Sequence, residues 1–284
     1  MVRVELLFVR HGYSCANAWK KKQMGLHWLY ADPELTKEGI QLCEERRSVL
    51  ESLVDSYFPG HSYTIGTSSM IRTQQTAYHM FLKGAHHKTY TIFPHIGEVG
   101  IDVSNFPLAA EKQRDLLGPS VTGHLDKDLR GSTNYYNKSN WPLFVKWLHH
   151  EGKHHLFKTD DDVYRAVLFS HGKFIRDSLH QPKANNNDVF FVRLDTETGD
   201  LLETKKCTEF PEPPTASVDG CRIHKHVHYL TGASSPESKT KTKTKTKTKK
   251  TKTKTRRNSR NNSSSNTRKN NNNNNTKNAT HRRR

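Results

Sequence analysis

The stretch VELLFVRHGYSCAN, Val4–Asn17, decides the fold of this 284-residue chain. Its first six residues form a compact run rich in apolar, β-branched and aromatic side chains, which is typical of a buried strand. Arg10-His11-Gly12 follows that run directly. Because the carboxyl ends of strands line the ligand crevice of an open α/β sheet, the stretch predicts reactive side chains at such an end.

A second stretch repeats this arrangement. Residues 164–169 (YRAVLF) read as another buried strand, and Ser170-His171-Gly172 comes directly after it. If the two strands lie in one sheet, two imidazoles and the guanidinium of Arg10 gather at one spot. The glycine after each histidine lets the backbone approach a ligand closely.

A third basic group follows a short predicted strand at residues 63–66. The segment Ser68-Ser69-Met70-Ile71-Arg72-Thr73 opens a helix predicted over 69–82. A helix N-terminus beside two arginines suits a phosphate group. Alone, an Arg-His-Gly triplet is a weak signal and Arg72 would be a solvated helix residue. Their joint occurrence at predicted strand ends favours a site.

The rest of the first 210 residues continues the alternation of strands and helices. A helical pattern runs from Thr36 to Phe58, and Asn140 is a candidate N-cap for a further helix. A strand is predicted at 90–93 and a hairpin over 188–204. Residues 99–139 show no sustained period and are interpreted as an insertion or lid. The alternation predicts an α/β layered domain with an antiparallel edge.

Four motifs, in order and spacing, resemble the histidine phosphatase superfamily in its phosphoglycerate-mutase-like branch. They are Arg10-His11-Gly12 with Asn17, Leu35-Thr36-Lys37-Glu38-Gly39 with Gln41, Ser68–Ala77, and Ser170-His171-Gly172. The resemblance extends from Val4 to about Leu194. It implies a three-layer αβα sandwich with the site at the carboxyl ends of the strands.

The resemblance also implies roles for individual residues. His11 is the expected nucleophile and forms a phosphohistidine, which water then hydrolyses. Glu98, in Gly97-Glu98-Val99-Gly100, is the expected proton donor, and Asp102 and Glu111 are rival candidates. The remaining catalytic or phosphate-binding positions are Arg10, Asn17, Arg72, His171 and Gly172. No metal or other cofactor is expected, because side chains supply the positive charge.

Two departures from the mutase pattern favour a phosphatase over a phosphoglycerate-type mutase. Ala16 precedes Asn17 where the mutases carry Trp, and Val99-Gly100-Ile101 follows Glu98 where they carry Arg and then Tyr-Gly. The expected partner is therefore a phosphorylated small molecule or phosphoprotein, selected by residues 99–139. Two alternatives stay open: the mutase, and a catalytically vestigial fold whose basic tail binds nucleic acid.

The net charge of +18 belongs to one end of the chain. Of the 46 Lys and Arg residues, 18 lie between Lys239 and Arg284, where there is no Asp or Glu; residues 1–238 hold 28 basic and 28 acidic residues. The composition predicts a catalytic domain over 1–231 and a disordered tail over 232–284. Such a tail suits nucleic acid or another polyanion.

The cysteines and the apolar runs bear on the compartment. Cys15, Cys43, Cys207 and Cys221 form no CxxC pair or disulfide framework. They are expected to be reduced thiols in the cytoplasm, with the nucleus as a second possibility. The run at residues 4–9 is too short for a signal peptide, and no stretch reaches the ~20 apolar residues of a transmembrane segment.

Other basic clusters have a plainer interpretation. His149-His150, His154-His155, and the alternating His224, His226 and His228 could suggest a metal site. They lack accompanying ligands at fixed spacing, so solvated surface histidines are favoured. Lys20-Lys21-Lys22 could steer an anionic substrate or form a solvated face.

Overall fold

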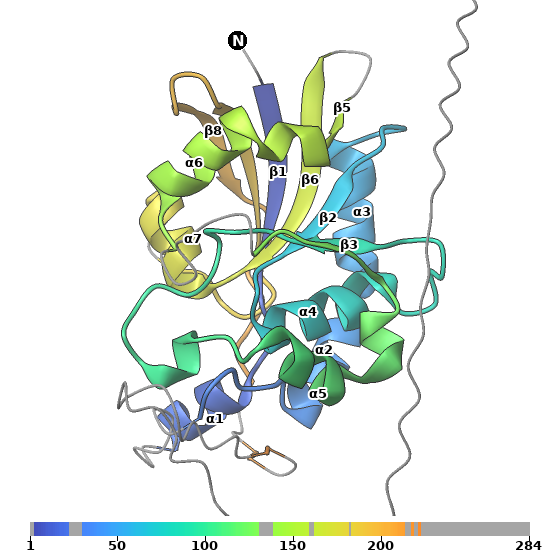
Figure 1. The fold of residues 1–284 in the computed structure, drawn as a ribbon, viewed down its shortest axis with the longest axis vertical. Helices are drawn as coiled ribbons and strands as arrows, with labels where there is room; N and C mark the ends of the chain where they lie inside the picture. The colour runs from blue at the N-terminus through green and yellow to red at the C-terminus, as the bar shows by residue number, and fades with distance from the viewer. Residues whose placement is uncertain are drawn as a thin grey trace, which may run out of the picture. The chain divides into compact units, whose positions relative to one another are not determined.

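The computed structural model describes residues 3–22, 30–130, 139–158, 162–181, 183–213, 217–218 and 221–222. Its centre is the parallel pair β1 (Arg3–Arg10) and β6 (Val163–Ser170), in which Arg10 lies opposite Ser170. These are the two strands that the sequence predicts most clearly. Both end at the same edge of the sheet (Figure 1).

In the described ranges the sheet has eight strands: seven follow the order β4-β3-β2-β6-β1-β7-β8, and β5 pairs with β6. The bounds of the others are β2 Thr64–Thr67, β3 Tyr90–Ile92, β4 Leu125–Asp128, β5 Phe157–Lys158, β7 Val189–Asp195 and β8 Leu201–Lys206. β1, β2, β3, β4 and β6 run parallel, while β7 and β8 form an antiparallel hairpin. The expected antiparallel edge is confirmed.

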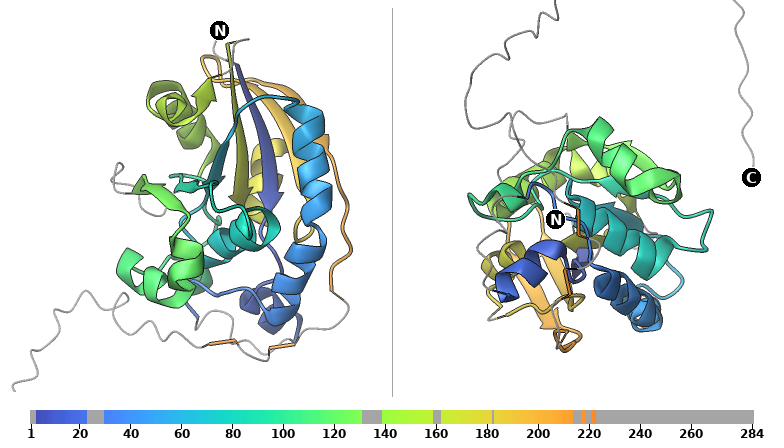
Figure 2. Two further views of the ribbon diagram at one scale, coloured as in Figure 1. Left: turned by 90° about the vertical axis from the view of Figure 1, so that its right-hand side faces the viewer. Right: turned by 90° about the horizontal axis from the view of Figure 1, so that it is seen from below.

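Alternate residues of β1 enter two separate cores. Leu6 and Phe8 pack toward α6 (Trp141–His150) and α7 (Gly172–Leu179). Leu7 and Val9 pack with residues of α2 (Lys37–Glu45), α3 (Arg47–Tyr57) and the π-helix η2 (Tyr78–Leu82). Because successive side chains of a strand point to opposite faces, helices cover the sheet on both sides (Figure 2). The predicted three-layer αβα sandwich is confirmed.

The helix predicted from Thr36 to Phe58 is two helices. α2 and α3 meet at Arg46, whose backbone (φ −88°, ψ 1°) leaves the helical region. The buried guanidinium of Arg46 donates to the carbonyl oxygen of Asn186 and the side chain of Asn187. These contacts are distant in sequence, so the apolar spacing alone does not reveal the break. Similarly, the helix predicted over 69–82 is α4 (Ile71–Ala77) followed by η2.

The prediction that residues 99–139 are irregular is wrong in part. The segment contains η3 (Val103–Asn105), α5 (Ala110–Thr122) and β4. Gly118, with φ +70°, and Pro119 interrupt α5, and the residues of β4 are mostly exposed. The kink and the exposed edge strand explain the weak apolar period. The short elements α1 (Cys15–Lys21) and η5 (Gly152–His155) complete the described fold.

The expectation of four reduced thiols is also wrong. Cys15 and Cys221 form a disulfide across 206 residues of sequence, and the free cysteines are Cys43 and Cys207. Cys15 lies in a small cluster with Trp19 and Tyr30, against which Val218 and Cys221 pack. No local spacing signals a pairing this distant. The cysteine argument for a reducing compartment therefore no longer holds.

The predicted tail lies outside the described residues. Contacts between residues group Met1–Gly232 as one unit and Ala233–Arg284 as another. Within the described ranges, no helix is both long and apolar enough to cross a membrane.

Candidate active site

The predicted reactive residues meet at the carboxyl edge of the sheet. His11 follows β1, His171 follows β6 and Ser68 follows β2. The backbone N–H of His11 donates to the Ser170 carbonyl at 2.9 Å, and that of Ser68 donates to the Phe169 carbonyl at 3.0 Å. These bonds continue the sheet pairing by one residue. They hold the imidazole rings of His11 and His171 with centroids 5.1 Å apart.

The ring of His11 is buried and its hydrogen bonding selects one tautomer. Nδ1 lies 2.7 Å from the carbonyl oxygen of Gly12. Because a carbonyl oxygen only accepts, Nδ1 must carry the proton, and the lone pair of the neutral ring is on Nε2. The Asn186 amide donates to the carbonyl oxygens of both His11 and Gly12, and Gly12 N–H donates to Thr76. The nucleophile loop is thus fixed from two sides.

Electrostatics keeps His11 neutral. Burial lowers its pKa well below the usual 6.5, and the guanidinium groups of Arg72 and Arg10 lower it further. His171 has its pKa lowered for the same reasons, burial first and Arg72 next. At neutral pH both rings are therefore uncharged, and the positive charge of the site is on the arginines.

His171 presents one nitrogen to the protein and one to the site. Its Nε2 lies 2.7 Å from the Ser68 hydroxyl oxygen, which also contacts Thr73. Its Nδ1 is buried, has no hydrogen-bond partner among the described residues and lies 3.9 Å from Oε2 of Glu98. When Ser68 donates to Nε2, the proton of the neutral ring is on Nδ1, which can then donate to a bound oxyanion.

Arg10 and Arg72 are held by backbone carbonyls. Arg10 Nη1 donates to the Ala184 carbonyl, and Arg72 Nη1 donates to that of Ser104 at 2.9 Å. Arg10 Nε is buried and finds no hydrogen-bond partner within the described part of the chain. A Cβ on Gly172 would lie 2.8 Å from this Nε, so only glycine at the start of α7 lets the guanidinium come this close. Unpaired N–H groups of the first turn of α7 add to the anion-binding character of this position.

The side-chain carbonyl oxygen of Asn17 accepts hydrogen bonds within the protein. Its Oδ1 accepts from the N–H and the hydroxyl of Ser14, in a capping box that begins α1. Oriented this way, the amide can offer its NH₂ group to a ligand. Asn17 lines the same pocket as Arg10 and His11.

The candidate acids fall in different places. Glu98 lines the pocket, and one of its oxygens accepts from the Val99 N–H at 3.1 Å. Asp102 lines the pocket too, whereas Glu111 is an exposed residue of α5 and is not part of the pocket wall. Geometry thus leaves Glu98 and Asp102, with Glu98 next to His171.

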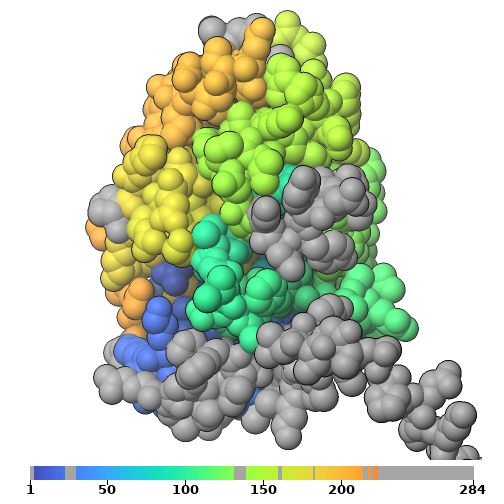
Figure 3. All heavy atoms as spheres, turned by 60° about the vertical axis from the view of Figure 1, so that its left-hand side comes forward, coloured from blue at the N-terminus to red at the C-terminus, as the bar shows by residue number. Residues whose placement is uncertain are grey.

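The pocket has a volume of about 570 Å³. Its floor is formed by Arg10, His11 and Arg72, and residues of α1, α7 and the 98–105 segment form its walls. Figure 3 faces the region where α1 (blue), the 100–110 segment (blue-green) and α7 (yellow) meet. Of the segment 99–139 that is predicted to select the substrate, residues between 99 and 105 line the pocket.

Ligand atoms of His11, Glu98 and His171 lie within 4.8 Å of one another, the one group in the described ranges whose spacing could hold a metal ion. The two guanidiniums that disfavour a proton on these rings disfavour a divalent cation in the same way. The residue set therefore suits an anion better than a metal.

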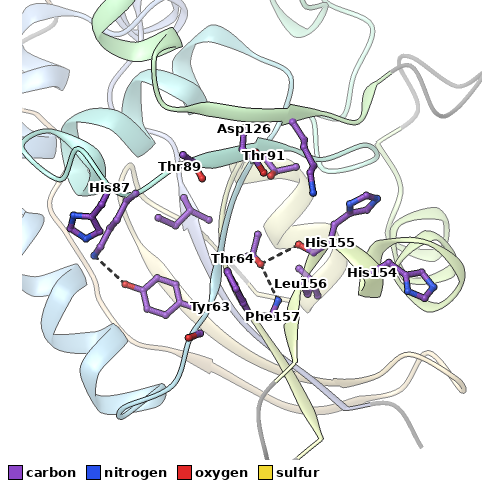
Figure 4. Close-up of a pocket in the computed structure, with 14 residues that line it drawn as sticks. Tyr63, Thr64, His87, Thr89, Thr91, Asp126, His154, His155, Leu156 and Phe157 are labelled. Atoms are coloured by element: carbon purple, nitrogen blue, oxygen red, sulfur yellow. Dashed lines mark hydrogen bonds between the residues drawn. The ribbon is translucent and has the colours of Figure 1, made fainter.

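The other histidines that the structure describes lie outside this site. His154 and His155 line a separate groove of about 490 Å³ together with His87 (Figure 4). The ring of His155 stacks on Trp147. His224, His226 and His228 lie outside the described residues.

Several supporting residues escaped the sequence analysis. Buried Asp32 accepts from the N–H groups of Ile71 and Leu108 and so ties the start of α4 to the 98–110 segment. Asn186 holds the nucleophile loop. Ser68 and Thr76 lie inside the motif quoted above, but their partners, His171 and Gly12, are about 100 and 60 residues away. Only the tertiary structure reveals these pairs.

Comparisons with known proteins return structures of similar fold. No protein-family model and no curated protein matches the chain. A phosphoserine phosphatase from Entamoeba histolytica has 15% identity and TM-score 0.40, covering 71% of this chain and 96% of its own. An ecdysone phosphate phosphatase from Bombix mori, solved with tungstate, has 12% identity and TM-score 0.45, and the match covers 74% of this chain and 95% of that one. A phosphoglycerate mutase from Plasmodium falciparum has 16% identity and TM-score 0.36, and the match covers 74% of this chain and 96% of that one.

Proposed function

We propose that this chain hydrolyses phosphomonoesters through a phosphohistidine on His11. The observation that carries the proposal is the state of the His11 ring: buried, neutral and protonated on Nδ1 by its bond to Gly12. Its Nε2 lone pair faces a pocket whose floor carries two guanidinium groups. A nucleophilic nitrogen beside fixed positive charge is what attack on a phosphoryl dianion requires.

In the first step, Nε2 of His11 attacks phosphorus and the bond to the leaving oxygen breaks. Arg10 and Arg72 neutralise charge on the non-bridging oxygens, and the amide of Asn17 adds a neutral donor. His171 contributes through Nδ1, whose proton Ser68 positions. Each donor of this kind is typically worth ~3–4 kcal/mol in the transition state.

Glu98 completes the proton balance. Its carboxylic acid protonates the leaving oxygen, so that an alcohol departs. The resulting carboxylate then accepts a proton from water as the water oxygen attacks the phosphohistidine. The nitrogen–phosphorus bond breaks, inorganic phosphate leaves, and His11 returns to the neutral form. The 3.9 Å approach of Glu98 to His171 supports this role by placing the acid next to the phosphate-binding nitrogen.

The phosphoglycerate-type mutase alternative shares the first step. It differs in the acceptor, which is a hydroxyl of a second substrate molecule instead of water. The vestigial alternative requires that the reactive groups fail to meet, and the convergence of His11, Glu98 and His171 speaks against it.

Trapping of the intermediate tests the proposal. The protein is mixed with a ³²P-labelled phosphomonoester and quenched in acid or in alkali. We expect an alkali-stable, acid-labile label on the native chain and none on His11→Ala. A phosphatase then delivers the label to inorganic phosphate, and a mutase delivers it to a second ester. Equal turnover by His11→Ala would overturn the mechanism.

We further propose that the basic segment Lys239–Arg284 binds polyanions. Its 18 positive charges come without a Phe, Tyr or Trp side chain, so binding would follow counterion release without base readout. RNA and DNA are polyanions of this kind. Retention on immobilised nucleic acid should therefore fall steeply between about 50 and 200 mM salt.

A further inference from the structure

The chain that follows β8 is attached to α1, the helix that forms one wall of the active-site pocket. We call the described residues of this part, 207–213, 217–218 and 221–222, the strap. From β8 the strap runs beside α3 and α2 (orange in Figure 2). It reaches α1 at the disulfide between Cys221 and Cys15, the first residue of that helix. The disulfide therefore joins the strap to the wall of the pocket.

The position of α1 matters for the pocket. The helix brings three residues to the pocket wall, Ala16, Asn17 and Lys20. Cys15 directly precedes them and lies four residues after the proposed nucleophile His11. The helix has only seven residues, and a helix of that length is not stable in water by itself. Its position, and with it that of the Asn17 amide, must therefore be set by contacts with the rest of the protein.

The strap supplies part of those contacts. Trp19 of α1 stacks on Tyr30 with ring centroids 3.6 Å apart. The small buried cluster around this pair consists of Cys15, Trp19 and Tyr30, with Val218 and Cys221 packed against it. At the last residue of α1, the ammonium group of Lys21 donates a hydrogen bond to the Pro213 carbonyl. The strap thus covers apolar surface of α1 and contacts both ends of the helix.

A second anchor holds the strap next to Arg10. The N–H of Phe210 donates to Asp188 at 2.8 Å, and the Phe210 carbonyl accepts from the Asn185 amide at 2.9 Å. Oε1 of Glu212 lies 3.9 Å from Nη1 of Arg10. These contacts do not involve the disulfide, so they keep this part of the strap in place when the disulfide opens. An opened disulfide therefore releases only the end of the strap that packs against α1.

The two sulfur atoms of the disulfide differ in access. Cys15 is buried, with 2% of its surface exposed, whereas Cys221 is partly exposed. An attacking thiolate therefore reaches the sulfur of Cys221, and the sulfur of Cys15 is the leaving group. The free thiol of Cys43 takes no part in this exchange, because it is buried and burial raises its pKa to about 12.

We propose that the Cys15–Cys221 disulfide is a thiol switch that holds α1 in the position that binds the phosphorylated substrate. A dithiol reductant opens the switch. Its first thiolate bonds to the Cys221 sulfur, and the electron pair of the broken sulfur–sulfur bond leaves on Cys15. Its second thiolate then bonds to its first sulfur, so that the reductant becomes a disulfide and the Cys221 sulfur leaves. Both cysteines end as thiols, and two electrons and two protons have passed to the protein.

Reduction affects one wall of the pocket and leaves the nucleophile in place. The end of the strap separates from α1, and the Asn17 amide loses the support that fixes its position. The bond between His11 and the Gly12 carbonyl does not depend on the strap. The reduced chain should therefore bind the phosphate ester less tightly and turn it over more slowly, and reoxidation should reverse both effects. The inference rests on the proposed phosphatase function.

Kinetics of the full chain in its two redox states tests the switch. The chain is kept oxidised or reduced with dithiothreitol, and alkylation followed by mass spectrometry counts its free thiols. We expect two free thiols in the oxidised chain and four after reduction. Since a misplacement of about 1 Å can cost up to 10²-fold in rate, kcat/KM for a small phosphomonoester should fall by about tenfold on reduction. Reoxidation should restore it.

Two serine variants locate the effect. Cys221→Ser should match the reduced chain and no longer respond to dithiothreitol. The matched control, Cys207→Ser, removes another cysteine of the strap, keeps the disulfide and should respond as the native chain does. Four free thiols in the oxidised chain, or equal kcat/KM in both redox states, would overturn the proposal. Loss of the far-UV circular dichroism of the native chain on reduction would also overturn it, because the disulfide would then be required for the whole fold.

Two measurements without turnover separate this inference from the proposed function. Hydrogen exchange should become faster in α1 on reduction and stay unchanged in α4, and calorimetric titration with inorganic phosphate should show a higher Kd. Both changes in a chain that turns over no phosphomonoester would support the switch and overturn the phosphatase. Turnover that does not depend on the redox state would do the reverse.

Discussion

The pocket at the carboxyl edge and the groove of Figure 4 are similar in size and both contain histidine and lysine, and of these two only the pocket has the features of an active site. In the pocket at the carboxyl edge, His11 and His171 are buried and each has one nitrogen held by the protein. In the groove of Figure 4, His154 is exposed and His155 stacks on Trp147. The comparison shows that a histidine becomes reactive when hydrogen bonds fix its tautomer and buried charged groups surround it. A cluster of several histidines is not enough.

The strongest way to break this comparison is to remove one histidine from each hollow. We expect His11→Ala to lower kcat/KM by about 10⁴-fold or more, because no other group can form the covalent intermediate. His154→Ala, the matched change in the groove, should stay within about twofold. Phosphate release from both variants checks this. A large loss in His154→Ala would mean that the groove takes part in the reaction.

The next largest effect concerns the acid. Glu98→Gln should slow alkyl phosphates by about 10²–10³-fold and activated aryl phosphates by less than tenfold, because a good leaving group needs no proton. Glu111→Gln, outside the pocket wall, serves as control. Equal slowing of both substrate classes by Glu98→Gln would assign a structural role to Glu98. Asp102→Asn would then be the variant to measure.

Ser68 tests whether the protein side of His171 matters. Ser68→Ala removes the hydroxyl at 2.7 Å from Nε2. We expect about a tenfold loss in kcat, at the lower end of the 10–100-fold losses that follow removal of residues orienting metal-bound imidazoles. The ¹⁵N chemical shifts of the ring report the accompanying change of tautomer. Ser62→Ala, in the groove, should change neither. Unaltered ring shifts in Ser68→Ala would rule out a positioning role.

The pH dependence of stability and of kcat/KM distinguishes the buried histidines His11 and His171 from solvated histidines. Their pKa values in the fold lie well below 6.5, so as pH falls below 6.5 the unfolded chain takes up protons that the folded chain does not. Stability is therefore complete above about pH 6.5 and declines as pH falls toward the lower, folded-state pKa values. The acidic limb of kcat/KM should likewise lie below 6.5. Urea unfolding and rate profiles between pH 4.5 and 8 measure both; a rate that already halves at pH 6.5 would contradict the lowered pKa of His11.

The smallest effect is expected from the tail. A chain that ends at Thr231 should keep kcat on a small phosphomonoester within about twofold, because residues 1–238 carry balanced charge and every proposed catalytic group. The same chain should lose its low-salt retention on nucleic acid. Lost turnover would show that the tail assists catalysis.

The strand pattern and the motifs could be predicted from the sequence because each depends on residues that are close together in the chain. The side-chain types of residues 4–9 and 164–169 alone predict buried strands. His11, His171 and Arg72 follow predicted strands in the sequence, and they follow β1, β6 and β2 in the structure. Parallel strands bring their carboxyl ends to one edge, so the convergence of these groups could be predicted. The αβα layers follow from the same alternation.

The features that only the tertiary structure reveals are contacts between residues that are distant in the sequence. The break at Arg46, the Cys15–Cys221 disulfide, the Ser68–His171 bond and the convergence of Lys20 with Lys173 each join segments about 100 residues apart or more. No spacing rule connects such positions. The pKa of His11 belongs here too, because it depends on burial and on two guanidiniums brought together only by the fold. The sequence by itself determined which reactive groups exist and at which edge they lie; folding determined their protonation, their supports and the charge around them.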